Sequence, residues 1–192
     1  MTITAPLRRD TRVADGIAVG YPLIYREGRV TEQSFRGRYF EEFEVGNAFE
    51  TAERTVGEGD ILAFAALSGD NNPLHVDPQY AATTQFGRQI AHGLLGLSIA
   101  SGLAWQTGVL EGTTEALTAV DWKFRAPIFI GDTVRLRLEV KQKKAVSRLG
   151  AGFVVVDVQL LNQDGVVVQK GTWTVLVRLR PEGPGPAASS AP

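Results

Sequence analysis

The second half of the chain alternates apolar and polar residues in the manner of half-buried strands. In the clearest stretch, 133–141, charged residues alternate with four apolar ones: Val134, Leu136, Leu138 and Val140. This pattern predicts one buried and one solvated face. Further strands are predicted at 116–124, 153–161 and 166–179. Turn residues at 162–165 and at 145–152 separate the last three strands, so we interpret the segments as consecutive antiparallel strands.

The middle of the chain lacks this alternation and contains a long apolar stretch from Gly93 to about residue 110. It is apolar on nearly every face, which is typical of a helix wrapped by protein or inserted in a membrane. A core helix is favoured, because Gln106 and several glycines interrupt a run that is near the minimum length for a span.

Shorter elements are predicted before this helix. A loosely alternating, partly β-branched run at 49–56 indicates a first strand. Asp60 is interpreted as the cap of a helix at 61–67, which ends at Ser68-Gly69. Asp77-Pro78 then predicts an N-cap followed by proline at the first position of another short helix.

This order of elements indicates an α+β domain in which an antiparallel sheet wraps around a central buried helix, the hotdog fold. A second copy would cover the open sheet edges, which predicts a homodimer or a higher homo-oligomer. The domain is predicted at 34–180. Residues 1–33 are interpreted as an N-terminal extension, and 181–192, rich in Pro, Gly, Ala and Ser, as a disordered tail.

Composition narrows the possible functions. The chain has 192 residues, 44% of them hydrophobic, a formal net charge of -1 and no cysteine. These values predict one soluble domain without the bulk positive charge that recruits nucleic acid. Disulfides, thiolate catalysis and cysteine-ligated metals are excluded. Charged residues such as Arg8, Arg9 and Asp10 interrupt the N-terminus, which argues against a secretory signal and makes a cytoplasmic location the default expectation.

The candidate chemistry lies in two neighbouring stretches. Asp70 and His75 stand five positions apart on a Gly/Asn/Pro backbone that cannot run as a regular helix and can turn both side chains toward one point. In the second stretch, Gln89-Ile90-Ala91-His92-Gly93, a helix beginning at Gly93 would direct free N–H groups and a positive dipole end toward the same point. An acid/base pair beside such a helix end suits chemistry on a carbonyl compound.

Each of these residues also has a structural interpretation. Asp70 can cap its own turn, as Asp residues in such loops often do. A lone His75 would more often be structural, but both histidines of the chain lie in this region. We interpret His92 as a residue that fixes the helix start. Gly93 either donates its main-chain N–H to a negatively charged oxygen or serves only as a glycine that permits tight packing. No metal site is predicted, because no further ligand stands at helical or hairpin spacing.

The stretch from Phe64 to His75, with Asp77-Pro78 and the stretch from Phe86 to Gly93, resembles the signature of the MaoC-like dehydratases and (R)-specific enoyl-CoA hydratases. Residues 123–132 are similar to a strand-turn marker of that family, and the resemblance covers roughly 37–180. It implies a hotdog dimer that hydrates trans-2-enoyl-CoA to (R)-3-hydroxyacyl-CoA, or runs the reverse dehydration. It also implies no metal or redox cofactor, with coenzyme A present only as part of the substrate.

Position by position, the resemblance implies that Asp70 and His75 form a catalytic dyad and that the Gly93 N–H is the oxyanion donor. Asn72 would hold the dyad in place. Two alternatives keep the same fold: an acyl-CoA thioesterase and a non-catalytic acyl-thioester binding protein. Acyl chain length, and coenzyme A against a carrier protein, remain open. Three basic residues were considered as contacts for coenzyme A phosphates, although exposed cations are usually only solvated: Arg88, Lys123 and Arg125.

Overall fold

A six-stranded sheet, in which every paired strand runs antiparallel, forms the base of the domain. The computed structural model describes residues 37–181, so the predicted extension at 1–33 and residues 182–192 lie outside the described part. The strands follow the spatial order β1-β4-β5-β6-β3, with β2 also paired to β4. Their bounds are β1 Ala48–Glu50, β2 Arg54–Thr55, β3 Thr114–Phe124, β4 Thr133–Val146, β5 Ala151–Leu161 and β6 Val167–Arg178.

The predicted strand order is right for β4, β5 and β6 and wrong for β3. These three strands are joined by short turns, with a 3-10 turn Ser147–Leu149 before β5 and the predicted turn at 162–165 before β6. Strand β3 instead pairs with β6, Val120 lying opposite Trp173, and occupies the edge of the sheet. Residues 125–132 therefore carry the chain across the sheet from β3 to β4.

Strand β4 confirms the alternation read from the sequence. Its four apolar residues between 134 and 140 are buried, and the charged ones between them are not. The single strand predicted at 49–56 is wrong in detail, because it consists of two short pieces, β1 and β2, that both pair with β4. Between them, Thr51 binds Leu136 through both its main-chain N–H and its hydroxyl, which interrupts the ladder.

Between residue 37 and β3 the chain forms four α-helices: α1 Glu58–Ser68, α2 Pro73–Val76, α3 Pro78–Ala82 and α4 Gly93–Gln106. Asp77 caps α3 as predicted, accepting hydrogen bonds from the N–H groups of Gln79 and Tyr80. Asp60 is not the cap of α1, since Gly57 holds that position. Its carboxylate lies in the first turn and accepts the Gly57 N–H at 3.0 Å. Gly69 ends α1 with a φ of +78°, where a side chain would be strained.

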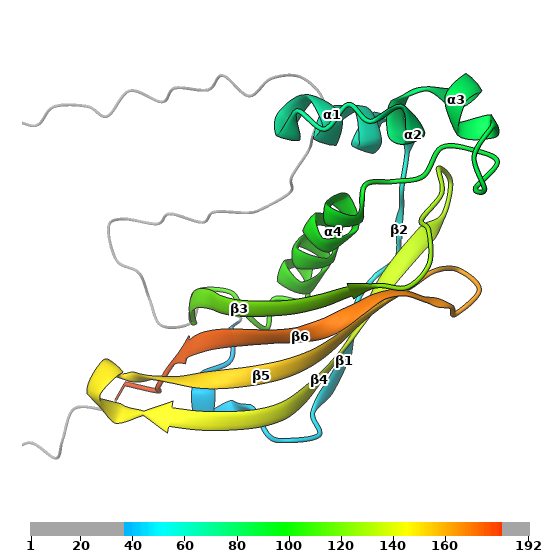
Figure 1. Cartoon of the computed structure of the whole chain (residues 1–192). Coiled ribbons are helices and arrows are strands. Elements are labelled where there is room, and N and C mark those ends of the chain that lie inside the picture. The colour runs from blue at the N-terminus through cyan, green and yellow to red at the C-terminus, as the bar shows by residue number, and fades with distance from the viewer. Residues whose placement is uncertain (1–36, 182–192) are drawn as a thin grey trace, which may run out of the picture. The chain divides into compact units, whose positions relative to one another are not determined.

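Helix α4 is the predicted buried helix, and it ends at Gln106 rather than near residue 110. In Figure 1 the sheet curves around α4, while α1, α2 and α3 gather beyond the N-terminal end of that helix. Leu95, Ile99 and Leu103 are buried in the core against the apolar face of the sheet. Among the described residues, no helix has both the length and the apolar character that crossing a membrane requires.

Candidate active site

Asp70 and His75 lie in the short connection between α1 and α3. The side-chain oxygen of Asn72 accepts the Leu74 N–H at 3.0 Å and so caps the single turn α2, which Pro73 begins. The Asn72 N–H donates to the Asp70 carboxylate at 3.3 Å. This turn brings His75 back toward Asp70. The contacts of Asn72 are compatible with the expected role of holding these two residues in place.

His75 is held at its ring and at its main chain by the stretch that precedes α4. Its Nδ1 donates to the carbonyl of Ile90 at 2.8 Å, and Nε2 of Gln89 donates to the His75 carbonyl at 2.8 Å. Because a carbonyl only accepts, Nδ1 carries the hydrogen and Nε2 of a neutral His75 keeps its lone pair. Gln89 is buried, and sequence reasoning gave it no role although it stands within the quoted motif.

His92 stands immediately before α4, at the helix start where a structural role was predicted for it. It is the N-cap residue of α4, but its side chain makes no cap hydrogen bond. Its Nε2 donates to the main-chain carbonyl of Asp70 at 2.9 Å. Its ring lies against that of His75, with centroids 3.9 Å apart, and near Phe64 on another side at 5.0 Å. His92 is 2% exposed, and its Nδ1 has no partner among residues 37–181.

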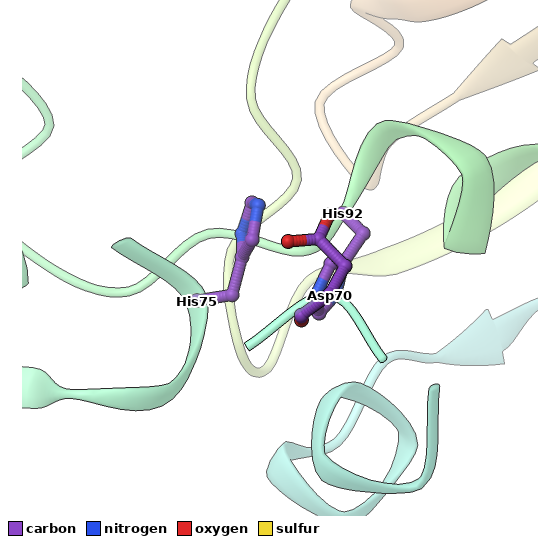
Figure 2. Close-up of side chains that lie close together, drawn as sticks. All are labelled: Asp70, His75 and His92. Atoms are coloured by element: carbon purple, nitrogen blue, oxygen red, sulfur yellow. Dashed lines mark hydrogen bonds between the residues drawn. The ribbon is translucent and has the colours of Figure 1, made fainter. Parts of the chain in front are cut away.

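The Asp70 carboxylate and the two imidazoles converge. A carboxylate oxygen of Asp70 and one ring nitrogen from each histidine lie within 4.8 Å of one another. In Figure 2 the carboxylate is turned toward the His75 ring, with His92 behind Asp70. Within the described part of the chain the carboxylate and the His75 ring share no hydrogen bond. A water molecule is the natural bridge between them.

The same cluster bears on the expected absence of a metal. Sequence reasoning found no third ligand near the histidines, and that reasoning is wrong, because Asp70 lies beside both. Nδ1 of His75 and Nε2 of His92 are committed to main-chain carbonyls. One nitrogen of each ring and a carboxylate oxygen are left, and these ligand types suit a transition metal. The absence of a metal cofactor stays a prediction.

Gly93 is the first residue of α4, and its N–H has no partner among the described residues. A Cβ atom at this position would lie 2.8 Å from the ring of Phe124 on β3, so a larger residue would require that ring to shift, and glycine also suits close approach. The Gly93 carbonyl accepts a hydrogen bond from Nε2 of Gln169 at 3.0 Å. The indole N–H of Trp122 donates to Oε1 of the same Gln169 amide at 2.9 Å. The two interpretations of Gly93 are therefore compatible.

The stretch 89–93 is itself fastened to the crossing segment 125–132. Ile90 forms a β-bridge with Phe129, and the Ala91 N–H donates to the carbonyl of Ile128 at 2.8 Å. Buried Asp132 accepts the Phe129 N–H and closes this turn. The stretch 89–93 and the family's strand-turn marker at 123–132 thus meet in the structure, and the marker supports the stretch before α4.

Sequence reasoning missed Gln169, a buried amide that contacts the first turn of α4 from β6. Its signal was a polar residue directly after three valines in a predicted strand. Ser98 on α4 is exposed, and its hydroxyl donates to the Leu94 carbonyl. The three basic residues considered for phosphate contacts are exposed, and Arg88 lies over the Phe129 ring at 3.9 Å.

A sheet wrapped around one helix, with an acid/base cluster at the helix N-terminus, defines a hotdog-fold protein. A Mycobacterium tuberculosis protein described as having a double hotdog fold shares this architecture, with a TM-score of 0.65 at 20% identity over 82% of this chain and 52% of its own. The MaoC like domain model matches residues 41–160. The chain therefore belongs to the MaoC-like family.

Relatives within the family are hydratases and dehydratases. An (R)-specific enoyl-CoA hydratase of Rhodospirillum rubrum is 40% identical over 146 residues, 74% of this chain and 93% of the relative. A 3-hydroxybutyryl-CoA dehydratase of Methylorubrum extorquens is 33% identical over 67% of this chain and 82% of its own length. The structure of an R-hydratase from Pseudomonas aeruginosa aligns with a TM-score of 0.65 at 31% identity, over 80% of this chain and 96% of that protein. The chain is an enzyme of the hydro-lyase class.

Proposed function

We propose that this chain hydrates trans-2-enoyl thioesters of coenzyme A to (R)-3-hydroxyacyl-CoA, or catalyses the reverse dehydration. The observation that carries the proposal is the convergence of the Asp70 carboxylate and a His75 ring nitrogen, within 4.8 Å, beside the N-terminus of α4. The names of the relatives support the reaction class. The roles of the individual residues rest on the geometry.

In this mechanism a water molecule binds between Asp70 and His75. Asp70, an acceptor when ionised, takes a proton from the water while the oxygen adds to C3 of the enoyl group. His75 accepts the second hydrogen of the water at Nε2, because Nδ1 is occupied by its bond to Ile90. The dyad then returns a proton to C2 from the same face, so that H and OH add syn across the double bond.

Negative charge develops on the thioester oxygen when water adds to C3. The Gly93 N–H lies at the positive end of the α4 dipole and would donate to that oxygen. The hydrogen bond from Gln169 to the Gly93 carbonyl would hold this donor in place. We assign Asn72 a positioning role, because it caps α2 and binds the Asp70 carboxylate.

A second copy of the chain completes the proposal, because β3 is an edge strand with apolar side chains facing solvent. Leu117, Val120 and Phe124 on β3 are each at least 41% exposed, and Leu94 and Trp105 on α4 are exposed as well. An edge strand of eleven residues is a template for pairing with another strand. We infer that β3 lies at a homodimer interface.

The reaction is tested with the purified chain and crotonyl-CoA, by following the loss of the conjugated enoyl absorbance and identifying the enantiomer of the product. Formation of the (R)-3-hydroxy product is expected. Release of free thiol without hydration would instead favour the thioesterase alternative. Binding of crotonyl-CoA and longer enoyl thioesters without turnover would favour the non-catalytic binding protein.

A further inference from the structure

The mechanism above leaves one buried titratable side chain at the site unused, that of His92. It is the residue that contacts both members of the proposed dyad, through its Nε2 to the Asp70 carbonyl and through its ring face to His75. The ring of Phe64 lies near it as well, with centroids 5.0 Å apart. A side chain 2% exposed and contacted by these groups has little freedom to adopt another rotamer.

The loop that carries Asp70 depends on this contact. Within residues 37–181, every other hydrogen bond of residues 69–72 goes to a residue between 65 and 76, such as the bond from the Asp70 N–H to the Ser68 hydroxyl at 3.2 Å. The bond from His92 spans 22 positions and ties the loop to the start of α4. Asp70 itself is exposed, so burial does not hold it.

We propose that His92 is a positioning residue for the hydration reaction, an inference that rests on the proposed function. Its Nε2–H fixes the main chain of Asp70, and its ring limits the tilt of His75. The gap in which the attacking water sits therefore keeps a constant width. A misplacement of about 1 Å at such a gap can lower the rate about 100-fold.

Three substitutions of His92 distinguish the effect of its Nε2–H donor from the effect of its ring against His75. His92→Gln keeps an N–H at the place of Nε2, His92→Asn moves the amide to the place of Nδ1, and His92→Phe keeps a ring against His75 but has no donor. Asn and Gln have the same functional group, so the pair is a matched comparison. Thermal unfolding and circular dichroism establish that each variant is folded.

The expected result is a split between kcat and KM. His92→Gln should stay within about tenfold of the wild-type kcat, while His92→Asn and His92→Phe should fall about 100-fold with KM little changed. The chain has two histidines, so nitrogen-15 NMR of the rings gives two assignable signal sets. We expect the hydrogen on Nδ1 of His75 and on Nε2 of His92, and faster amide exchange at residues 69–72 in the Asn and Phe variants.

The NMR and exchange measurements do not depend on turnover, so they test the placement of the loop even if wild-type protein proves inactive on enoyl thioesters. A wild-type kcat in His92→Phe would overturn the proposal. So would an equal loss in the Gln and Asn variants at equal melting temperature. Activity that a chelator abolishes and Zn²⁺ restores would also overturn it, because His92 would then be a metal ligand.

Discussion

Nδ1 of His75 donates a hydrogen bond of 2.8 Å to the main-chain carbonyl of Ile90, a residue fifteen positions further along the chain. This bond decides which ring nitrogen of His75 is available to a substrate. Because the acceptor belongs to the main chain, the arrangement does not depend on the side chain at position 90. The stretch before α4 thus sets the chemistry of a residue that lies in α2.

Removing the charge of Asp70 should abolish most of the activity. Asp70→Asn keeps the size of the side chain but cannot take a proton from water, and we expect kcat to fall by about 100-fold to 10,000-fold. His75→Ala should fall by a similar factor. Asp164→Asn, in the exposed turn between β5 and β6, is the control and should keep wild-type rates. Steady-state kinetics with crotonyl-CoA measure all three, and a dyad variant with full activity would exclude the dyad.

Gly93→Ala should destabilise the protein through its contact with Phe124. The added methyl would lie 2.8 Å from the Phe124 ring, so this ring, which is 54% exposed, has to shift from its place against α4. The double variant Gly93→Ala with Phe124→Ala removes the clash and keeps the N–H of residue 93. Chemical denaturation should show a smaller loss for Gly93→Ala in the Phe124→Ala background than in the wild type. Equal losses in both backgrounds would show that the two residues do not interact.

Gln89→Leu should weaken the hold on the His75 main chain. Its buried amide donates to the part-buried His75 carbonyl at 2.8 Å, and loss of this donor should cost about 1 kcal/mol. Both the free energy of unfolding and kcat should decrease. Gln79→Leu changes an exposed glutamine in α3 and serves as the matched control. If the two variants behave alike, Gln89 does not support His75.

Charge on the edge strand should dissociate the proposed dimer. Val120 on β3 is 41% exposed, and a lysine there would place two cations at a β3 interface. Light scattering after size exclusion should give the mass of two chains for the wild type and of one chain for Val120→Lys. Val45→Lys, at a 64% exposed valine before β1, should leave the mass unchanged. A wild-type mass of one chain would reject the dimer.

Local pattern predicted most of the fold, because burial repeats every second residue in β4 and the long apolar run forms α4. The apolar run did not show that only one face of α4 is buried within the chain, while Leu94 and Trp105 on the other face are exposed. The proline and Asp77 at the start of α3 were equally readable, since capping involves neighbours in sequence. The place of β3 was not, because the alternation within a strand does not specify which strand lies beside it. That depends on how residues 125–132 cross the sheet.

The candidate site divides in the same way. Asp70 and His75 stand close in sequence on a turn-forming backbone, so their approach could be predicted. The contacts of His92 and Gln169 span 22 and 76 positions, and their partners are main-chain carbonyls that have no signature in a sequence. A histidine beside a helix start and a glutamine among valines gave no indication of those partners.

The β-bridge between Ile90 and Phe129 joins the stretch before α4 to the crossing segment between β3 and β4. The loop of Asp70 is not part of that bridge: residues 69–72 are exposed and are tied to the start of α4 by the bond from Nε2 of His92. Exposed segments with few buried contacts open at a lower free energy than the domain as a whole. A protease that needs an open main chain should therefore cut residues 69–72 before it cuts the sheet. An enzyme built in this way would lose its activity on heating before its domain unfolds.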